Sequence, residues 1–467
     1  MSTVESRIAG AASRSGMLPP REQFLAMPAQ DLRDVRARIG TRAESGVVVS
    51  RAVLFLATVL LTTGFAYELY AVLAAVRITP FQIVFLVLCT LAFGWVALGS
   101  LTTAMGFLPL FAGERADPIV LPFAGGVPTQ RTALLFPVYH ENPAIVAGTI
   151  EAIVAELDAL DRTRAFDVFI LSDTRGDAAG QAEEAVYAAL ARRLRSVLPV
   201  YYRRRPENTE RKAGNIKEWV ERFGGGYGAF VILDADSILS GELLVRLALA
   251  MQAHPAVGLI QTVPRLTGGT TLFQCLLQFA TDVYGPASAA GLAAWHGTQG
   301  NYWGHNAIVR TIAFAAAAGL PVLPGRPPFG GHIQSHDFVE AALLQRAGWQ
   351  VAMVPTAAGS YEGSPPGLID YVGRDRRWAQ GNLQHVPMLA ASGLTAMSRI
   401  HLAMGAASYI VPAIWAASLA VGIVLALQGE HLIPSYFQDS RTLFPIWPII
   451  DPGDAFRLFL ATMTVVM

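Results

Sequence analysis

Apolar residues near both ends of the chain form uninterrupted runs. Glu68 is the only charged residue from Ala52 to Val76, a second run without charge extends from Ile78 to Ala112, and a third from Leu402 to Leu427. Since about 20 apolar residues cross a bilayer as a helix, these runs predict membrane spans on both sides of a central domain. The connection between the first two runs is short, so we expect them to form a hairpin.

The segments near the two ends of the chain predict its orientation in the membrane and the boundaries of its domains. Residues 1–50 are polar and rich in arginine, which beside a first span predicts a cytoplasmic tail. We expect the hairpin at 51–113, the central domain at 114–395 and a second membrane region at 396–467. The final apolar stretch, Leu458 to Met467, is too short to cross a bilayer, so the chain is expected to be truncated within a span.

Between residues 114 and 395 short apolar runs alternate with longer amphipathic segments, a pattern typical of buried strands and helices. This alternation predicts an α/β domain with a mostly parallel, Rossmann-like sheet, inserted between helical transmembrane segments. Ligands of such sheets bind beyond the carboxyl ends of the strands. The predicted strands are Ala133–Val138, Phe166–Leu171, Val200–Arg203, Phe230–Leu233 and Val257–Gln261. The predicted helices are Pro143–Leu157, Ala178–Leu194, Lys212–Arg222 and Glu242–Gln252.

Composition narrows the class of protein further. Of the 467 residues 53% are hydrophobic and 15% charged, with a mean hydropathy of +0.40, which is too apolar for an ordinary soluble enzyme. A formal net charge of +0 gives no electrostatic reason to expect nucleic acid as a partner. The two cysteines, Cys89 and Cys275, fit neither a disulfide framework nor a metal cluster. These features favour membrane spans around a soluble core.

Two carboxylates, Asp234 and Asp236, follow the predicted strand Phe230–Leu233 with one residue between them. A strand that continued through them would turn both side chains to the same face. Carboxylate oxygens are suitable ligands for Mg²⁺ or Mn²⁺, and an ion held there would neutralise a diphosphate. The competing interpretation is a strand that ends in an ordinary polar turn.

Polar residues follow the other predicted strands as well. The first strand ends before Tyr139–Asn142, the second before Asp173, and the third in Arg203–Arg205, with Lys212 soon after. We therefore expect a site for a nucleotide diphosphate and its metal at this edge, with Asp173 on the base or ribose and Lys212 on phosphate. The alternative for Lys212 is the solvated start of a helix. The absence of the G-x-G-x-x-G and G-x-x-x-x-G-K-[ST] motifs argues against a nicotinamide dehydrogenase and a P-loop nucleotidase.

The segment Ser335–Glu340 opens another predicted helix. Asp337 is a candidate general base that would deprotonate a hydroxyl for attack on a sugar carbon. A helix cap formed by Ser335 or Asp337 is the alternative. His336 and Glu340 are i, i+4 neighbours, and we favour a packing or hydrogen-bonding role because no third metal ligand accompanies them.

A basic segment, Gly373–Asn382, contains a tryptophan among its charges. A solvated helix face would explain the charges alone. The adjacent Arg377 and Trp378 fit better with a phosphate-binding arginine beside an aromatic ring that stacks on a sugar or base.

Together these residues resemble the processive glycosyltransferase family 2 synthases, whose motifs are D, D-x-D, D and Q-x-x-R-W. One position departs from that pattern, because Arg374 stands where the family has Gln. This departure, with four further segments, is similar to the synthases of osmoregulated periplasmic glucans. The resemblance covers about residues 130–395 in detail and the flanking spans in layout. The residues that match the motifs are Asp173, Asp234, Asp236, Asp337, Arg377 and Trp378, and the further segments are Arg211–Asn215, Tyr284–Pro286, Tyr302–Asn306 and Ser335–Ala341.

The resemblance implies a GT-A fold on the cytoplasmic face of the bacterial inner membrane. It implies an inverting, processive glucosyltransferase that uses UDP-glucose to build a β-1,2-linked glucan backbone. For the donor, the resemblance implies that Tyr139, Glu141 and Asp173 contact uridine, that Lys212 binds the diphosphate and that Arg374 assists; Asp234 and Asp236 would face the donor and a Mg²⁺ or Mn²⁺ ion. For the reaction, it implies that Asp337 is the base and that Arg377 stabilises the leaving UDP. Trp378 would border donor and acceptor, and the acceptor side would include Trp303, His305 and Asn306.

The partners that the resemblance implies are UDP-glucose, a growing glucan acceptor, the lipid bilayer, acyl carrier protein and periplasmic glucan-processing proteins. The glycine-rich segment Gly325–Ile333 precedes Asp337, and we expect it to be a mobile lid over the donor rather than an ordinary surface loop. Two other functions stay open. One is a β-1,4 or β-1,3 polysaccharide synthase of the same fold, and the other is a transporter with a regulatory nucleotide-binding domain.

Overall fold

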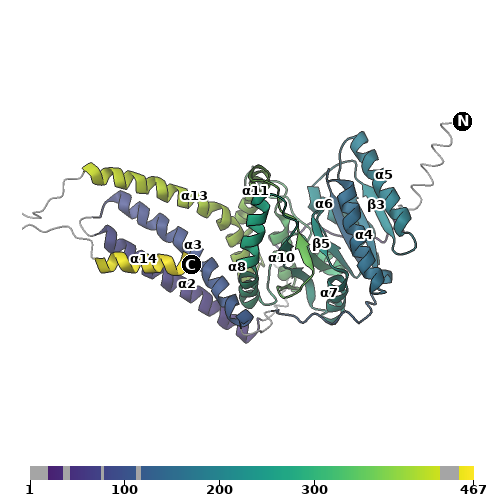
Figure 1. Cartoon of the computed structure of the whole chain (residues 1–467), viewed down its shortest axis with the longest axis horizontal. Coiled ribbons are helices and arrows are strands. Elements are labelled where there is room, and N and C mark those ends of the chain that lie inside the picture. Colours follow the sequence, from purple (N-terminus) through teal and green to yellow (C-terminus); the bar gives the residue numbers. More distant parts are fainter. Residues whose placement is uncertain (1–18, 35–42, 75–77, 112–116, 432–451, 467) are drawn as a thin grey trace, which may run out of the picture.

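The computed structural model describes residues 19–34, 43–74, 78–111, 117–431 and 452–466. Long helices form one half of the elongated molecule and an α/β domain forms the other (Figure 1). Most of the predicted arginine-rich tail, part of the predicted hairpin connection and residues 432–451 lie outside the described residues.

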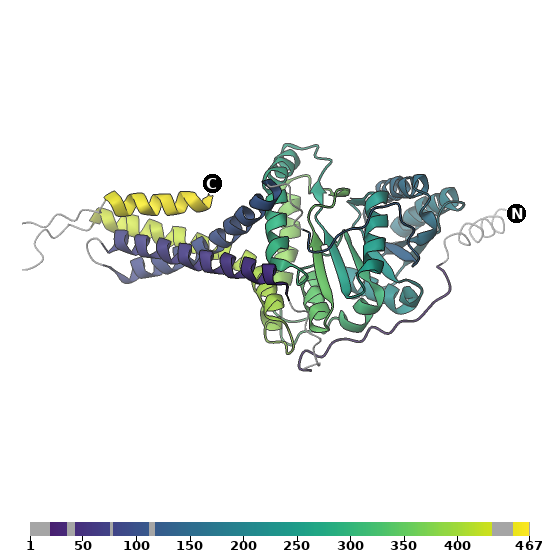
Figure 2. The ribbon, with the colours of Figure 1, turned by 90° about the horizontal axis from the view of Figure 1, so that it is seen from below.

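The membrane half contains α2 (Ser45–Leu73), α3 (Pro80–Phe111), α13 (Ala396–His431) and the shorter α14 (Pro452–Val466). Among the described residues, three helices are long and apolar enough to cross a membrane: α2, α3 and the Ala396–Gln428 part of α13. These helices lie side by side at one end of the molecule in both views (Figures 1 and 2). Helix α2 begins at Ser45, several residues before the apolar run that starts at Ala52.

The central sheet is mostly parallel, as predicted. Its order among the described residues is β3-β2-β1-β4-β8-β6-β9, and only β8 is antiparallel to its two neighbours. A second, three-stranded sheet with the order β5-β10-β7 was not predicted, because its strands are two or three residues long. The large sheet comprises β1 (Thr132–Val138), β2 (Phe166–Ser172), β3 (Val200–Arg204), β4 (Ala229–Ile232), β6 (Val257–Thr262), β8 (Ala307–Arg310) and β9 (Gln350–Val354). The small sheet comprises β5 (Ser237–Leu239), β7 (Arg265–Leu266) and β10 (Ser360–Glu362).

Helices cover both faces of the large sheet. The four helices predicted between strands are present, with ends that differ from the prediction by at most two residues. The helices of this half are α4 (Pro143–Ala159), α5 (Asp177–Leu194), α6 (Arg211–Phe223), α7 (Gly241–Ala253), α8 (Leu272–His296), α9 (Thr311–Ala317), α10 (His336–Arg346), α11 (Leu368–Leu383) and α12 (His385–Met388), with 3-10 turns at Thr163–Ala165 and Gly224–Gly226.

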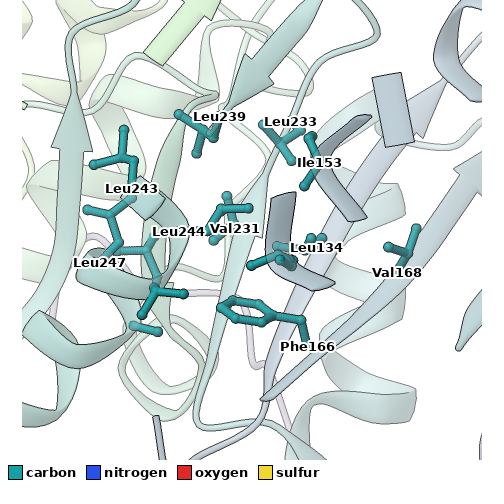
Figure 3. Packing of buried hydrophobic residues seen from close by; sticks show 14 of the residues in the cluster. Leu134, Ile153, Phe166, Val168, Val231, Leu233, Leu239, Leu243, Leu244 and Leu247 are labelled. Carbon is teal, nitrogen blue, oxygen red and sulfur yellow. The ribbon is translucent and has the colours of Figure 1, made fainter. Parts of the chain in front are cut away.

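Burial on both faces explains why the strands are continuous apolar runs. Leu134 and Val231 belong to the core under α4 and α7 (Figure 3). Their chain neighbours Leu135 and Phe230 belong to the opposite core, with Trp219 of α6. All five side chains are fully buried, and they place the strand ends at fixed positions along one edge.

Helix α8 joins the α/β domain to the membrane half and was not predicted. It crosses α3 so closely that a Cβ atom at Gly106 would lie 1.9 Å from the carbonyl oxygen of Ala287, and one at Gly291 would lie 1.8 Å from that of Thr102. At the end of α8, the guanidinium of Arg51 donates to the carbonyl oxygen of Trp295 at 2.7 Å. The membrane helices are therefore packed directly onto the α/β domain.

Residues 19–34 lie along the α/β domain as an extended segment rather than as a free tail (Figure 2). The amide of Gln23 donates to the carbonyl oxygen of Arg222 at 2.8 Å, and that of Gln30 donates to Gly319 at 2.9 Å. Met27 is buried between these two hydrogen bonds along the chain.

The α3–α8 crossing supplies a test of the connection between the two halves. We expect Gly106→Ala to lower the free energy of unfolding by about 1–3 kcal/mol, because the new methyl group meets backbone that cannot move aside cheaply. Gly99→Ala is the matched control on the same helix, since a Cβ atom there meets nothing within 4 Å. The thermal midpoints of the two variants in detergent provide the measurement. Equal midpoints would contradict the close crossing.

Candidate active site

The polar residues expected at the carboxyl ends of the strands lie along one edge of the sheet. Val138 of β1 pairs with Ser172 of β2, and Ser172 pairs with Arg204 of β3. The residues that follow these strands therefore start from the same level of the sheet. Asp234 follows β4, which pairs with β1 on its other side.

Asp173 is held by Arg205 in a buried bidentate ion pair. Nε and Nη2 of Arg205 donate to the two carboxylate oxygens at 2.7 and 2.8 Å, and both residues are at most 8% exposed. The same guanidinium donates to the carbonyl oxygens of Thr209 and Arg211 at 3.2 and 3.0 Å. Arg205 thus fixes Asp173 and the turn before α6 together. In the sequence, Arg205 is only one of three consecutive arginines. Its position directly after β3 was the one feature that could have indicated that it pairs with Asp173.

Tyr139 and Glu141 lie at the exposed rim beyond β1. The backbone amide of Tyr139 donates to the Glu141 carboxylate, and the Tyr139 ring is 47% exposed. His140 between them has a φ of 66°, a left-handed conformation, and its amide donates to Thr174 at 3.0 Å. These contacts join the rim after β1 to the loop after β2.

Lys212, in the first turn of α6, makes two contacts that tie three segments together. Its ammonium group pairs with the carboxylate of Asp234 and donates to the carbonyl oxygen of Gly304 at 2.9 Å. Burial acts to raise the pKa of Asp234, but Lys212 and then His305 lower it overall. The lysine is therefore not simply the solvated start of a helix.

Asp234 and Asp236 do not share a strand, so the strand-periodicity argument for them was wrong. Strand β4 ends at Ile232, and the amide of Ser237 donates to the carbonyl oxygen of Asp234 at 3.0 Å, closing a turn into β5. The two carboxylates still interact. Burial raises the pKa of Asp236 most, and the negative charge of Asp234 raises it further. The polar-turn interpretation describes the backbone correctly.

This turn can supply part of a metal site. In the described part of the chain, no group of three or more His, Cys, Asp or Glu residues has the arrangement of a complete metal site. Mg²⁺ is commonly held by one or two carboxylates together with substrate phosphates and water. Asp234 and Asp236 fit that kind of site, in which the donor completes the coordination.

A cleft of about 690 Å³ brings the second half of the expected site together. Its lining includes Asp236 from the turn after β4 and both Arg374 and Arg377 from α11. The guanidinium of Arg374 lies over the Trp378 ring, 4.6 Å from its centre. The remaining lining residues are Ser364, Pro365, Pro366, Ile369, Asp370 and Gly373.

Asp337 lies in the first turn of α10, opposite Gly304. A Cβ atom at Gly304 would lie 3.7 Å from Oδ2 of Asp337, so the Lys212–Gly304 contact and the candidate base adjoin the same residue. Ser335 precedes the helix but forms no side-chain capping hydrogen bond. Nδ1 of His336 lies 3.0 Å from Oε1 of Glu340, in agreement with the pairing expected for these neighbours.

The residues expected on the acceptor side differ in exposure. Trp303 is half-buried, and its amide donates to Oε1 of Gln261 at 2.8 Å. Asn306 is 0% exposed, and its amide group donates to Ser360 and to the Tyr361 carbonyl oxygen at 3.1 Å each. These contacts give Asn306 a structural role that anchors the small sheet, so an exposed acceptor contact is not its position in this fold.

His305 links the turn after β4 to the small sheet. Its Nδ1 lies 3.3 Å from Oγ of Ser237, and its Nε2 lies 3.2 Å from Oε2 of Glu362. Burial raises the pKa of Glu362, His305 lowers it, and Asp236 adds to the rise. Glu362 is a carboxylate beside the site that the sequence did not indicate, since it ends a strand of only three residues.

The segment Gly325–Ile333 is anchored at its end. The amides of Leu323 and Gly331 each donate to the other's carbonyl oxygen, at 3.0 and 2.9 Å. The side-chain amide of Gln384 donates to the carbonyl oxygens of Gly330 and His332 at 3.1 and 3.0 Å. Motion of this segment as a lid stays a prediction.

Two family models match the α/β domain and part of the membrane half. The model of glycosyl transferase family 2 matches residues 134–316, and that of glycosyl transferase family group 2 matches residues 229–448. Three similar proteins are all named glucans biosynthesis glucosyltransferase H. That of Rhodopseudomonas palustris (strain BisA53) is 48% identical over 97% of this chain and 63% of its own length. That of Vibrio cholerae is 43% identical over 96% and 62%, and that of Xylella fastidiosa 43% over 97% and 71%. The chain thus spans about 63% of the length of the first of these relatives.

The Asp173–Arg205 pair supplies a stability prediction. Arg205→Ala should lower the free energy of unfolding by about 3–5 kcal/mol, because it leaves a buried carboxylate without its partner. Arg193→Ala removes an arginine that is 58% exposed and paired with Glu151, so its effect should stay below about 1 kcal/mol. Chemical denaturation of both variants measures the difference. A similar loss in the two would contradict the structural importance of the buried pair.

Proposed function

Because this chain belongs to glycosyl transferase family 2, with relatives named glucans biosynthesis glucosyltransferase H, we propose that it transfers glucose from UDP-glucose onto a growing β-1,2-linked glucan. The observation that carries the proposal is the single cleft lined by Asp236, Arg374 and Arg377. A carboxylate suited to a metal and two cations suited to a diphosphate meet there. Asp337 is connected through Gly304 and Lys212 to Asp234, two residues before Asp236.

The donor would lie along the carboxyl edge of the sheet. Tyr139, Glu141 and Asp173 contact the uridine, of which Tyr139 offers an exposed ring for stacking. Arg205 orients Asp173 through two hydrogen bonds. Lys212 contacts the diphosphate, since an ammonium on a flexible stem can reach a phosphate from the start of α6.

A Mg²⁺ or Mn²⁺ ion bound with the donor would be held by Asp234 and Asp236. Such an ion neutralises charge on the diphosphate as it becomes a leaving group. Arg377 lines the same cleft and stabilises that charge directly, and Arg374 assists from one turn earlier on α11.

Transfer requires one base and one displacement. Asp337 takes the proton of the acceptor hydroxyl, and the hydroxyl oxygen attacks the anomeric carbon of glucose. The bond between that carbon and the UDP oxygen breaks, UDP leaves with the electron pair, and the configuration inverts. Trp378 borders the donor and acceptor, while Trp303 and His305 lie on the acceptor side.

The three helices that are long and apolar enough to cross a membrane identify a membrane protein, and we place the α/β domain on the cytoplasmic side of the bacterial inner membrane. In this proposal the enzyme is processive and adds each glucose to the product of the previous transfer. Acyl carrier protein and periplasmic glucan-processing proteins are the partners that the family resemblance suggests.

If Asp337 is the base, its replacement should lower the rate of glucose transfer but leave the affinity for UDP nearly unchanged. Asp337→Asn should lower the transfer rate by about 10²–10⁴-fold, because the amide cannot accept the hydroxyl proton. UDP affinity should change little, since Asp337 makes no proposed contact with the nucleotide. Radiolabelled glucan synthesis and UDP titration calorimetry measure the two quantities. A variant with full activity would remove Asp337 from this role.

The linkage is tested by the product itself. Membranes that contain the protein should convert labelled UDP-glucose into a glucan with β-1,2 linkages, and membranes with the Asp337→Asn variant serve as the control. Methylation analysis identifies the linkage. A β-1,4 or β-1,3 product would assign the chain to another polysaccharide synthase, and nucleotide-dependent transport without any product would favour a transporter.

A further inference from the structure

Residues 381–385, which join α11 to α12, contact the chain directly before the proposed base. We call them the α11–α12 junction. The amide of Gln334 donates to Oε1 of Gln384 at 2.9 Å. Nε2 of His385 lies 3.2 Å from the carbonyl oxygen of Ser335. Because a carbonyl oxygen only accepts hydrogen bonds, the imidazole carries a proton on Nε2. The side chains of Gln384 and His385 are both buried, so these contacts lie inside the protein.

The junction also packs closely against the start of α10. A Cβ atom at Gly381 would lie 2.5 Å from the backbone nitrogen of Ser335, so only glycine fits there. On the other side of Asp337, the ring of Phe338 stacks on that of His385, with centres 5.4 Å apart and an angle of 14° between the planes. Asp337 therefore lies between residues that the junction contacts. Since Ser335 forms no capping hydrogen bond with its side chain, the junction rather than a cap holds this helix start.

The same junction continues the helix that carries the proposed leaving-group arginine. Arg377 lies on α11 about one turn before Gly381. The side-chain amide of Asn382 donates to the carbonyl oxygen of Trp378 at 2.9 Å, and the backbone amide of Gln384 donates to that of Gly381 at 3.2 Å. A continuous helix therefore connects the arginine to the junction, and direct contacts connect the junction to the base.

Gln384 also holds the segment that precedes the base. Its carboxamide donates to the carbonyl oxygens of Gly330 and His332 at 3.1 and 3.0 Å, and it accepts from the amide of Gln334. One buried side chain thus satisfies three backbone groups of this segment. Buried backbone groups without partners are costly, so an apolar side chain could not hold the segment in the same way. The proposed reaction gives these hydrogen bonds no role.

The opposite side of the junction packs on a membrane helix. A Cβ atom at Gly405 of α13 would lie 2.6 Å from Nδ1 of His385 and 2.7 Å from Oδ1 of Asn382. Burial lowers the pKa of His385, although its contact with Ser335 acts against this, so the ring is neutral at pH 7. A neutral ring with its proton on Nε2 agrees with the contact to Ser335. The junction is therefore held between α13 and the start of α10.

We propose that the α11–α12 junction is a positioning element that holds the base Asp337 and the leaving-group arginine Arg377 at a fixed separation, with Gln384 and His385 as its positioning residues. The proposed function gives neither of these two a contact with the substrate. The inference rests on the roles proposed for Asp337 and Arg377. Both groups act in one transition state, so a small displacement of either from the reacting atoms lowers the rate.

The first test replaces the carboxamide that holds the segment before the base. Gln384→Leu leaves the three backbone groups without their partner and lets Asp337 shift. We expect kcat for glucan synthesis to fall by about 10–100-fold, because misplaced catalytic groups lose their advantage of orientation. KM for UDP-glucose should change by less than about twofold, since Gln384 contacts none of the proposed donor-binding residues.

Gln30→Leu is the matched control. Gln30 is also buried, and its carboxamide likewise donates to two backbone carbonyl oxygens, those of Pro28 and Ala316, at 3.0 and 3.2 Å. Neither acceptor belongs to the proposed site. This variant should lower the thermal midpoint as Gln384→Leu does, but it should keep kcat within about twofold. An equal loss of kcat in the two variants, or an unchanged kcat in Gln384→Leu, would overturn the proposal.

Two variants of His385 separate hydrogen bonding from packing. The side-chain nitrogen of His385→Gln can donate to the carbonyl oxygen of Ser335, whereas His385→Leu has no donor. We expect kcat to fall by about tenfold or more in His385→Leu and to stay within about threefold in His385→Gln. Equal values would make packing the only role of His385 and overturn its assignment. This pair decides the question if Gln384→Leu does not fold.

Hydrogen–deuterium exchange tests the junction without any measurement of activity. The peptide that contains Gln334 should exchange about tenfold faster in Gln384→Leu, because its amide loses the acceptor, and at the unaltered rate in Gln30→Leu. Unchanged exchange in Gln384→Leu would overturn the inference even if glucan is made. Faster exchange in Gln384→Leu, together with unaltered protein that makes no glucan from UDP-glucose, would instead overturn the proposed function on which the inference rests.

Discussion

The arrangement of the site depends on one ammonium group. Lys212 contacts the carboxylate of Asp234 at the end of β4 and the carbonyl oxygen of Gly304, which adjoins Asp337. It therefore connects the start of α6, the end of the central strand and the segment opposite α10. The two residues before Lys212, Glu210 and Arg211, have φ values of 57° and 51°, which is unusual for residues with side chains. That conformation persists because Arg205 donates to the carbonyl oxygens on both sides of it.

A small number of contacts also joins the α/β domain to the membrane half. The crossing of α3 and α8 requires Gly106 and Gly291, because any side chain there would meet opposing backbone. Arg51 of α2 donates to the carbonyl oxygens of Trp295 and His296 at the end of α8, at 2.7 and 2.9 Å, and to Oε1 of Gln299 beyond it, at 2.9 Å. A helix end carries partial negative charge on its free carbonyl groups, which a guanidinium neutralises well. These contacts hold the α/β domain at a fixed position relative to the first two membrane helices.

The sequence predicted the elements whose physical signal is long and periodic. Strands β1, β2 and β4 are buried on both faces, so their apolar runs stood out, and α4 to α7 showed clear amphipathic spacing. It did not predict α8, which contains Pro286 in its interior, or the small sheet, whose strands are too short for any period. At the site, the strand ends showed which polar residues would meet, but not their pairing. Arg205, which the sequence showed only as one of a basic run, is the buried partner of Asp173, and Asn306, expected on the acceptor side, anchors the small sheet. Tertiary contacts decide which polar groups are left exposed.

The cleft is lined by residues of both charges, Asp236 and Asp370 together with Arg374 and Arg377. Burial and Asp234 raise the pKa of Asp236, and burial with Asp236 raises that of Glu362, so the carboxylates after β4 and β10 disfavour one another as anions. Arg374 acts in the opposite direction on both. In the proposed function, Arg374 and Arg377 would meet the negative charge of a nucleotide diphosphate in this cleft. In the proposed function, a divalent cation bound with the diphosphate would add positive charge beside Asp234 and Asp236, and the ammonium of Lys212 would contact phosphate in place of Asp234. The donor and its metal are therefore expected to bind as one unit, with Lys212 exchanging one anionic partner for another.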